Sequence, residues 1–505
     1  MLTPILPPGI DSSTFQTILA ELSDIVGIDN LSSDATPGAL EGPDQKTIYG
    51  DPFSLRPNNS RQPSGAVRPG SVEEIQTIVR LANRYKLPLW TVSRGKNLGY
   101  GGTAPVVSGS MVLDLHRMNS ILEVNQEAAY AIVQPGVSFF DLFNYIHERK
   151  IDLWPSVPAI GWGSVVGNTL ERGFGYTPNG EHSQNQCGIV TQIGIHLTPA
   201  PEHYMWCDIS VQNEADLPFL VNTLTDLMRR NIIQNSPSIS NLFRQCILDP
   251  SPTLQSLISP CFGKGCIPET TLAQGQEMMK FGFWKASFSL YGPKSVVHAS
   301  WDVITETFSQ YDGVQLRTKE THRLARKYVS AIDIGAEEIP HSGLPTLNPL
   351  KMLSYRGRGG GHICFSPVFP PSGHELYSWY LGAKKKTIDA QFDFFADFHV
   401  YGRYIIGIEL VVYTPEEAAR CDRLYESLLD DTTRQGFTEY RTHVDYMDSV
   451  AGHFTFNNGA LRGCLQGLKD HFDPNGVLSP GKSGIWNSDG QPSVVVGVVK
   501  GDVGY

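Results

Sequence analysis

The stretch RGKNLGYGG, Arg94 to Gly102, directly follows the apolar run LPLWTV, Leu87 to Val92. The apolar run predicts a strand. The loop after it contains four glycines, whose backbone amides could converge on an anion together with the side chains of Lys96 and Asn97. It lacks the GxGxxG spacing of a dinucleotide fold and the GK[ST] of a phosphate-binding loop. On its composition alone, the loop is either a cofactor cradle or a flexible turn.

Length and charge restrict the class of protein. A chain of 505 residues favours two or three domains. Hydrophobic residues make up 41% and charged residues 18%, which is typical of a globular protein. The formal net charge of -11 argues against nucleic acid or an anionic membrane surface as the main partner, because both require a basic surface. No apolar run approaches the roughly 20 residues of a membrane span, so a small molecule is the expected partner.

Eight cysteines are scattered along the chain, without CxxC pairs or neighbouring histidines at metal-ligand spacing. We therefore expect no metal site and reduced, mostly buried thiols. Cys261 and Cys266 are the one close pair, and a bridge between them would suit a secreted protein. The chain begins MLTPILPPGIDSS, without the basic and apolar regions of a signal peptide, so we expect a cytoplasmic protein.

Helix signals dominate the first part of the chain. Ser13 and Gln16, at capping-box spacing, predict the start of a helix that ends at Gly27. Ser71 and Glu74 predict the start of a second helix, SVEEIQTIVRLANRYK. Strands are then predicted for MVLDL, ILEVN and AYAIVQPGVS, followed by the helix FFDLFNYIHERK.

From about residue 201 to 429, helices such as DLPFLVNTLTDLMRR alternate with strands such as FGFWKASFSLYG and YIIGIELVVY. No second glycine-rich cradle follows a strand in this part of the sequence. The chain is thus predicted to be of the α+β class, with a second domain that supplies a wall for the substrate.

Glycines also recur in WPSVPAIGWGSVVGNTLERGFGYTPNG, Trp154 to Gly180. Glycines at this density would allow the backbone to approach a flat ring of a cofactor closely. The alternative interpretation is that these glycines form a series of tight turns. We favour the binding interpretation, because two glycine-rich loops follow strands within a short length of chain.

Two further stretches carry reactive side chains. In EYRTHVDYMD, Glu439 to Asp448, the neighbours Tyr440 and Arg441 could bind an anionic oxygen, although such a pair is more often a packing ring beside a surface ion pair. DPNGVLSPGKSGIW, which ends at Trp486, is a turn-rich segment in which Lys482 is available to a cofactor or belongs to an ordinary loop.

Taken together and in this order, these stretches resemble the flavoprotein family of vanillyl-alcohol oxidase and p-cresol methylhydroxylase. The resemblance rests on LPLWTVSRGKNLGYGGTAPVVSGSMVLDL, VPAIGWGSVVGNTLERGFGYTP, GIVTQIG, EYRTHVDYMD and DPNGVLSPGKSGIW, and it runs from about Val67 to Trp486. It implies an α+β fold in two domains, an FAD-binding domain of PCMH type and a cap. The implied parts are an N-terminal helix and arm over 1–65, the FAD-binding domain over 66–200, the cap or substrate domain over 201–450, and a C-terminal segment over 451–505 that returns to the FAD domain.

The resemblance also implies site residues, because in this family the two glycine-rich loops hold the FAD pyrophosphate and flank the flavin. The matching FAD-binding positions are Gly95, Lys96, Asn97, Leu98, Gly102, Ser164, Asn168, Ile189 and Lys482. The matching catalytic positions are Tyr100, Tyr440, Arg441 and Tyr176. Two tyrosine hydroxyls and a guanidinium would bind a para-alkylphenol as phenolate. The implied reaction is hydride transfer from the benzylic carbon to flavin N5 through a p-quinone methide.

The chain departs from the family pattern beside the flavin. The vanillyl-alcohol-oxidase branch has an aspartate near flavin N5 where this chain has Ala159. The covalent flavin histidine of that branch matches Gly407, and we therefore predict noncovalent FAD. His399, Tyr401 and Tyr404 lie close in sequence and are interpreted as ordinary strand side chains.

A third departure is an apparent internal deletion. GYTPNGEHSQNQCGIVTQIG passes in a few residues from one motif to the next, with a join near His182 and Ser183, where relatives carry strands of the FAD domain. Loss of paired strands would expose ladder groups and open one wall of the cofactor site.

Three hypotheses follow. The first is an FAD-dependent oxidoreductase that acts on a para-substituted phenol. The second is an enzyme of the same fold that acts on a non-phenolic alcohol or a 2-hydroxy acid, as Ala159 and Gly407 would allow. The third is a truncated, inactive relative that serves as a binding module. The electron acceptor, oxygen or a carrier protein, stays open, and the family suggests a homodimer.

Overall fold

The computed structural model describes residues 5–32, 49–56, 61–155, 161–172, 187–322, 345, 347, 350, 352–353, 355–357 and 361–489. The described part has an α+β fold, in agreement with the sequence prediction. Its α-helices are α1 (Ser12–Val26), α2 (Val72–Tyr85), α3 (Phe139–Glu148), α4 (Val165–Arg172), α6 (Leu217–Arg229), α7 (Leu242–Leu248), α8 (Pro252–Ile258), α9 (Glu269–Met279), α10 (Lys294–Ser309), α12 (Gly373–Asp389), α13 (Ala418–Arg434), α14 (Met447–Gly452) and α15 (Phe456–Phe472).

Strands of the described residues form several sheets. The strands of the first part are β1 (Leu31–Ser32), β2 (Gly65–Val67), β3 (Leu89–Val92), β4 (Met111–Asp114), β5 (Ile121–Asn125), β6 (Tyr130–Val133), β7 (Leu153–Trp154), β8 (Ile193–His196) and β9 (Thr198–Pro199). The later strands are β10 (His203–Val211), β11 (Ser238–Asn241), β12 (Trp284–Gly292), β13 (Gln315–His322), β14 (Gly361–Phe365), β15 (Pro367–Phe369), β16 (Ala396–Val400), β17 (Ile405–Tyr413) and β18 (Thr438–Glu439).

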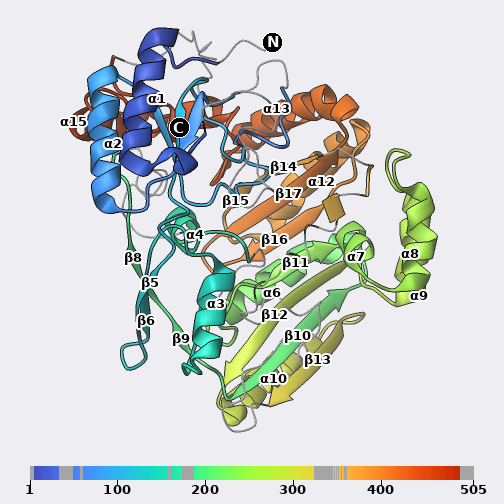
Figure 1. Cartoon of the computed structure of the whole chain (residues 1–505). Helices are drawn as coiled ribbons and strands as arrows, with labels where there is room; N and C mark the ends of the chain where they lie inside the picture. The colour runs from blue at the N-terminus through green and yellow to red at the C-terminus, as the bar shows by residue number, and fades with distance from the viewer. Residues whose placement is uncertain are drawn as a thin grey trace.

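The first sheet has the order β1-β2-β4-β3, and β2 and β3 both run parallel to β4. Helices α1 and α2 pack side by side against it, and their apolar faces form one core with the strands (Figure 1). The predicted start of α2 is confirmed, because the Ser71 hydroxyl accepts a hydrogen bond from the Glu74 amide at 3.2 Å.

The predicted cap of α1 is wrong by two residues. Asp11 is the N-cap, and its carboxylate accepts hydrogen bonds from the Thr14 amide at 2.9 Å and from the Ser13 hydroxyl at 2.7 Å. The carboxylate therefore takes the role that the pattern assigned to Ser13. The predicted end is confirmed, because the Gly27 amide donates to the Ser23 carbonyl at 2.8 Å.

The C-terminal segment adjoins β3. The Leu89 amide donates to the Val477 carbonyl at 2.7 Å, and the Ser479 amide donates to the Leu89 carbonyl at 2.8 Å. The DPNGVLSPGKSGIW stretch therefore lies beside the strand that leads into the RGKNLGYGG loop. This contact is what a returning C-terminal segment requires, whereas the residue limits of the domains stay predictions.

A smaller sheet with the order β5-β6-β8 packs on α3 and α4 and shares their core. The hydroxyl of Ser138 and the carboxylate of Asp141 form a capping box at the start of α3. The predicted join near His182 and Ser183 precedes β8 and lies outside the described residues.

A nine-stranded sheet, antiparallel at each of its described strand pairs, occupies the second half of the molecule. Its order is β13-β10-β12-β11-β16-β17-β15-β18, with β14 also paired to β17. Figure 1 shows α10 against the β10 end and α12 near the β17 end of this sheet. The predicted helix DLPFLVNTLTDLMRR and the predicted strands FGFWKASFSLYG and YIIGIELVVY are confirmed as α6, β12 and β17.

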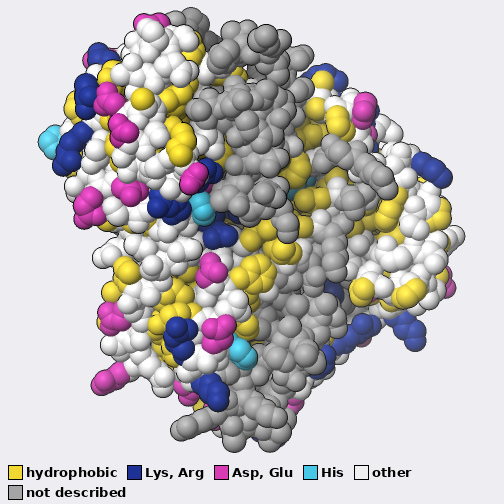
Figure 2. Space-filling view, in the orientation of Figure 1, with side chains coloured by type: hydrophobic (Ala, Val, Ile, Leu, Met, Phe, Trp, Pro, Cys, Tyr) yellow, Lys and Arg dark blue, Asp and Glu magenta, His cyan; other side chains and the backbone are white. Residues whose placement is uncertain are grey.

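Acidic and basic side chains are interspersed over α1 and α2 on the face that Figure 2 shows. Along the described residues, no helix combines the length and the apolar composition needed to cross a membrane.

Cys261 and Cys266 are not joined by a disulfide. Burial raises the pKa of Cys246 and of Cys364 to about 12, which keeps both thiols protonated.

Glu409 on β17 is a buried carboxyl, 2% exposed, whose Oε1 accepts one hydrogen bond from the Thr387 hydroxyl at 2.6 Å. Burial raises the pKa of Glu409 from 4.5 to about 8. The folded chain therefore keeps a proton that the unfolded chain releases above about pH 4.5, so this group lowers stability as pH rises from 5 to 8.

Replacing Glu409 by glutamine should remove this pH dependence, because the amide keeps the acceptor for Thr387 without a charge. At pH 8 the free energy of unfolding should rise by about 2–4 kcal/mol, whereas at pH 5 it should change little. Urea unfolding at pH 5, 6.5 and 8 measures the difference, and Glu306→Gln on the exposed side of α10 is the control. Equal pH slopes in the wild type and in Glu409→Gln would contradict the prediction.

Candidate functional site

A cavity of about 790 Å³ is lined by residues of the first sheet and its loops and by residues of the nine-stranded sheet. The structure brings most of the residues predicted for the site to its wall. These are Gly95, Lys96, Asn97, Leu98, Tyr100, Gly102, Ser164, Asn168, Arg441 and Lys482. Residues more than 340 positions apart in the sequence thus share one cavity.

The RGKNLGYGG loop is a tight turn built on the Asn97 carbonyl, which accepts hydrogen bonds from the amides of Tyr100 at 3.2 Å and Gly102 at 2.9 Å. Gly99 has a φ of 77°, and a Cβ at this position would lie 2.6 Å from Nε2 of His362. Any side chain at residue 99 would therefore clash with a ring that lines the cavity.

The second glycine-rich stretch leads into α4, and Ser164 precedes its first residue. The Ser164 hydroxyl accepts from the Gly167 amide at 3.0 Å and donates to the Pro135 carbonyl at 2.6 Å. A hydrogen bond connects the two loops, since Arg94 Nε donates to the Trp162 carbonyl at 3.0 Å. Lys96 extends over the Trp162 ring, with Nζ 4.9 Å from the ring centroid.

The charges at this wall suit an anion. The N-terminus of α4 carries the positive end of the helix dipole, and Ser164, Val166 and Gly167 at that end line the cavity. Lys96 adds a positive charge at the same wall, and Lys482 adds another with Nζ 4.4 Å from the Trp90 ring centroid.

Tyr100 and Arg441 meet at one point of the cavity. Tyr100 is 6% exposed, and its hydroxyl lies 2.8 Å from the Ser366 hydroxyl. The Arg441 guanidinium stacks over the Tyr100 ring, with Cζ 4.1 Å from the ring centroid, and donates to Oδ1 of Asn97. A phenol, a guanidinium and a loop amide therefore form one contiguous group.

Burial is the main cause that raises the pKa of Tyr100 well above its usual value, with smaller contributions from Cys364 and Tyr440 that outweigh the opposing charge of Arg441. Tyr100 is thus a neutral hydrogen-bond donor near pH 7. Tyr440 lies next to this group, and its amide donates to the Ser366 carbonyl at 3.2 Å, but Tyr440 is not among the described residues that line the cavity.

A second polar group, which the sequence analysis did not identify, lines the same cavity. The Asp397 carboxylate on β16 accepts a hydrogen bond from the Ser238 hydroxyl at 2.6 Å and lies 3.1 Å from the Arg244 guanidinium. His399, two residues along β16, places Nε2 3.3 Å from Asp397 Oδ1. Burial raises the pKa of Asp397, but Arg244 and His399 outweigh it, so that its net pKa is lowered and the carboxylate stays ionised.

Comparison with known proteins decides the family. Residues 63–195 match the FAD binding domain, and residues 352–483 match the C-terminal domain of FAD linked oxidases. The 4-cresol dehydrogenase [hydroxylating] flavoprotein subunit of Pseudomonas putida is 29% identical over 531 aligned positions, which cover 95% of this chain and 98% of that relative. The chain belongs to the PCMH-type FAD-binding flavoproteins.

Solved structures agree with this flavoprotein assignment. The 4-ethylphenol oxidase from Gulosibacter chungangensis has a TM-score of 0.82 at 26% identity, over 96% of this chain and 99% of that one. A p-cresol methylhydroxylase structure has a TM-score of 0.82 at 27% identity, over 95% and 99%. The flavoprotein is therefore an FAD-linked oxidoreductase with FAD as its cofactor, as the sequence predicted.

The residues of this flavoprotein fit FAD. Two tight glycine-containing loops, a helix N-terminus and two lysines supply the close backbone approach and the positive charge that a pyrophosphate requires. Aromatic and aliphatic side chains supply apolar wall for a flat ring, among them Trp154, Trp162, Ile408 and Leu410. Ile189 does not line the cavity; it packs against the core of α1 and α2, whereas its neighbour Val190 lines the cavity.

Gly407 is not among the described residues that line the cavity. A Cβ there would lie 3.1 Å from Phe369 and 3.3 Å from Pro367, while the next residue, Ile408, lines the cavity. Neighbouring residues of a strand face opposite ways, so a side chain at residue 407 would point away from the cavity.

A histidine that the sequence analysis missed does line the cavity. His362 on β14 is 4% exposed, and burial lowers its pKa to about 4, so its imidazole is neutral near pH 7. Tyr401 also lines the cavity and stacks on Tyr404 at 4.8 Å between ring centroids. Tyr176 and Ala159 lie outside the described residues.

Proposed function

We propose that this flavoprotein oxidises the benzylic carbon of a para-substituted phenol. The observation that carries the proposal is the stacking of Arg441 on Tyr100 in the wall of the cavity, with Cζ 4.1 Å from the ring centroid. The relatives named for 4-cresol and 4-ethylphenol act on substrates of this class, and both align with nearly the whole chain.

Tyr100 and Arg441, which both line the cavity, would bind the phenol oxygen, and Tyr440 lies beside Arg441 in the chain. A neutral Tyr100 hydroxyl donates a hydrogen bond, and the guanidinium adds a positive charge that favours the phenolate over the phenol. Phenolate formation pushes electron density through the ring towards the para carbon. The benzylic carbon then becomes a hydride donor.

FAD, when bound, supplies the chemistry of accepting that hydride. Loss of the hydride from the phenolate leaves a neutral p-quinone methide. Water adds to its benzylic carbon to give an alcohol, or the quinone methide loses a proton from the next carbon to give an alkene. Both outcomes require a group that accepts a proton.

The Asp397–His399 pair is the proton acceptor in this proposal. It lines the cavity that Tyr100 and Arg441 also line, and it supplies the acid and base function that Ala159 lacks. The ionised Asp397 carboxylate orients the imidazole and stabilises its protonated form, as in other carboxylate and histidine pairs.

Anaerobic titration of the purified holoenzyme tests the proposed function. A 4-alkylphenol is expected to bleach the flavin absorbance within seconds, whereas a 2-hydroxy acid such as D-lactate is expected to leave it unchanged. Bleaching by the hydroxy acid alone would favour the non-phenolic alternative. Purified protein without flavin would favour the truncated, inactive alternative, and it would overturn both enzyme hypotheses.

The same sample decides the flavin linkage. Acid precipitation is expected to release yellow FAD into the supernatant, in line with the prediction of noncovalent binding. A yellow pellet in the wild type that turns colourless in His362→Ala would instead identify a link through the imidazole that lines the cavity. A homodimer, a cytoplasmic location and reoxidation by oxygen or a carrier protein stay predictions.

A further inference from the structure

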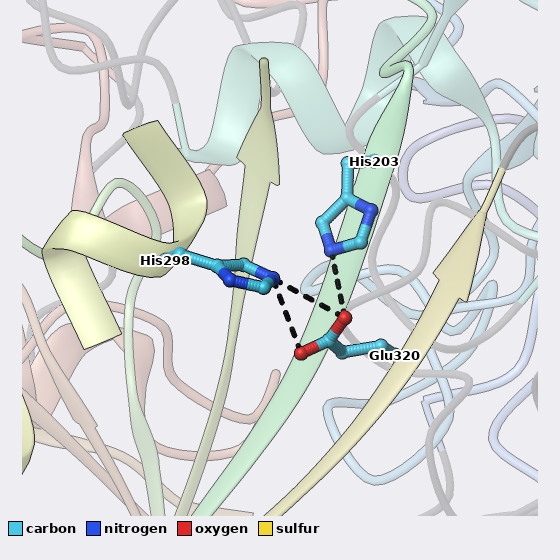
Figure 3. Close-up of side chains that lie close together, drawn as sticks. All are labelled: His203, His298 and Glu320. Atoms are coloured by element: carbon cyan, nitrogen blue, oxygen red, sulfur yellow. Dashed lines mark hydrogen bonds and ion pairs between the residues drawn. The ribbon is translucent and has the colours of Figure 1, made fainter. Parts of the chain in front are cut away.

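Three side chains of metal-binding types meet at one edge of the described nine-stranded sheet, and none of them lines the cavity. His203 lies at the start of β10, Glu320 lies on the edge strand β13, and His298 lies on α10 (Figure 3). Glu320 pairs with Met205 in the sheet register, so His203 and Glu320 lie on the same face of the sheet. Helix α10 packs on this face.

The distances match the geometry of a metal site. Nε2 of His203 lies 3.2 Å from the Glu320 carboxylate, and Nε2 of His298 lies 3.3 Å from it. The three ligand atoms all lie within 4.8 Å of one another. A tetrahedral zinc ion with bonds of about 2.0–2.1 Å has ligand atoms about 3.3 Å apart, so the imidazole and carboxylate spacing is already correct.

Burial leaves an entry path for an ion. His203 is buried, with a side chain 2% exposed, and forms the base of the site. The side chains of His298 and Glu320 are 41% and 33% exposed, so a water molecule can reach the fourth position. None of the three residues lines the cavity described above, so this site is separate from the flavin site.

We propose that His203, His298 and Glu320 bind one Zn²⁺ ion, or another divalent ion of the same coordination preference, with water as the fourth ligand. Two imidazole nitrogens and one carboxylate suit zinc and disfavour calcium or magnesium, which prefer oxygen ligands. β13 is the last described strand at its side of the sheet and pairs there with β10. The ion would hold this edge strand to β10 and to α10.

Titration of the chelator-treated holoenzyme with Zn²⁺ tests this proposal, with bound metal counted by elemental analysis. One Zn²⁺ per chain is expected, together with a higher midpoint of thermal unfolding when Zn²⁺ is present. His298→Ala and Glu320→Gln should each weaken Zn²⁺ binding by about 100-fold or more, and Glu320→Gln keeps the shape of the side chain. His374→Ala, at an exposed histidine of α12, should bind Zn²⁺ as the wild type does.

The alternative is a hydrogen-bonded group in which the Glu320 carboxylate accepts from both imidazoles without an ion. Wild-type protein that binds no more Zn²⁺ than His298→Ala would establish this alternative and overturn the proposal. Equal Zn²⁺ affinity in the wild type, His298→Ala and Glu320→Gln would place the ion elsewhere and overturn it as well. Flavin absorbance, recorded in the same samples, should stay constant, because the site is separate from the cavity.

Discussion

Replacing Arg441 by alanine is expected to lower kcat/KM for a 4-alkylphenol by about 10²–10³-fold, which is typical for loss of one group that stabilises a developing oxyanion. The guanidinium is the positive charge nearest to Tyr100 among the pairs that the structure describes, with Cζ 4.1 Å from its ring centroid. Without it the phenol oxygen would have hydrogen-bond donors but no counter-charge. Steady-state kinetics on flavin-saturated enzyme measure the loss.

The pH profile separates the charge of Arg441 from a structural role. In Arg441→Ala no guanidinium favours the ionised form of the bound phenol. The value of kcat/KM should therefore rise with pH towards about 10, the pKa of a free phenol. Ring-fluorinated 4-alkylphenols, which ionise at lower pH, should recover part of the loss. Arg434→Ala, at a side chain 73% exposed at the end of α13, is the control.

Arg441 also donates to Asn97 in the glycine-rich loop, so flavin occupancy must be measured in the variant. An Arg441→Ala enzyme that keeps its FAD and its kcat/KM would refute the phenolate role. A variant that loses only FAD would show that the residue supports the loop and has no part in binding the substrate.

Local elements and the cofactor loops could be predicted because their signals are local. A capping box, an apolar stripe and a glycine-rich loop after a strand each occupy fewer than about twenty consecutive residues. The order of the motifs then placed Tyr100 and Arg441 in one site. Asp11 shows the limit even here, since a carboxylate two residues upstream replaced the predicted cap.

The second polar group could not be predicted, because it depends on strand pairing. Asp397 and His399 look like ordinary strand residues, and only the pairing of β11 with β16 brings Ser238 and Arg244 to them. The face of the sheet to which each strand residue points could not be predicted from the sequence either. Gly407 faces Phe369, whereas His362, on a neighbouring strand, faces the cavity.

The proposed metal site is an extreme case of the same limit. Its ligands are more than twenty residues apart along the chain and come from a helix and two strands. Sequence rules for zinc sites depend on short spacings between cysteines and histidines, and none applies to this set.

Replacing Asp397 by asparagine is expected to lower kcat by about 10²–10⁴-fold, the usual range for loss of general base catalysis. Asparagine keeps the shape and can still accept the Ser238 hydroxyl, but it removes the charge that stabilises a protonated His399. Arg244 would also lose its ion-pair partner at 3.1 Å. KM should change less than kcat, because the phenol oxygen binds at Tyr100 and Arg441.

A comparison with His399→Gln tests whether the two residues act as one unit. Each single variant should lose a similar factor in kcat, and the double variant should lose little more than either one, because a pair that works together is not additive. Asp302→Asn, at an exposed position of α10, is the control for the charge change. Multiplicative losses in the double variant, or an unchanged kcat in Asp397→Asn, would contradict this prediction. Either result would show that another group accepts the proton and that Asp397 and His399 do not supply the acid and base function that Ala159 lacks.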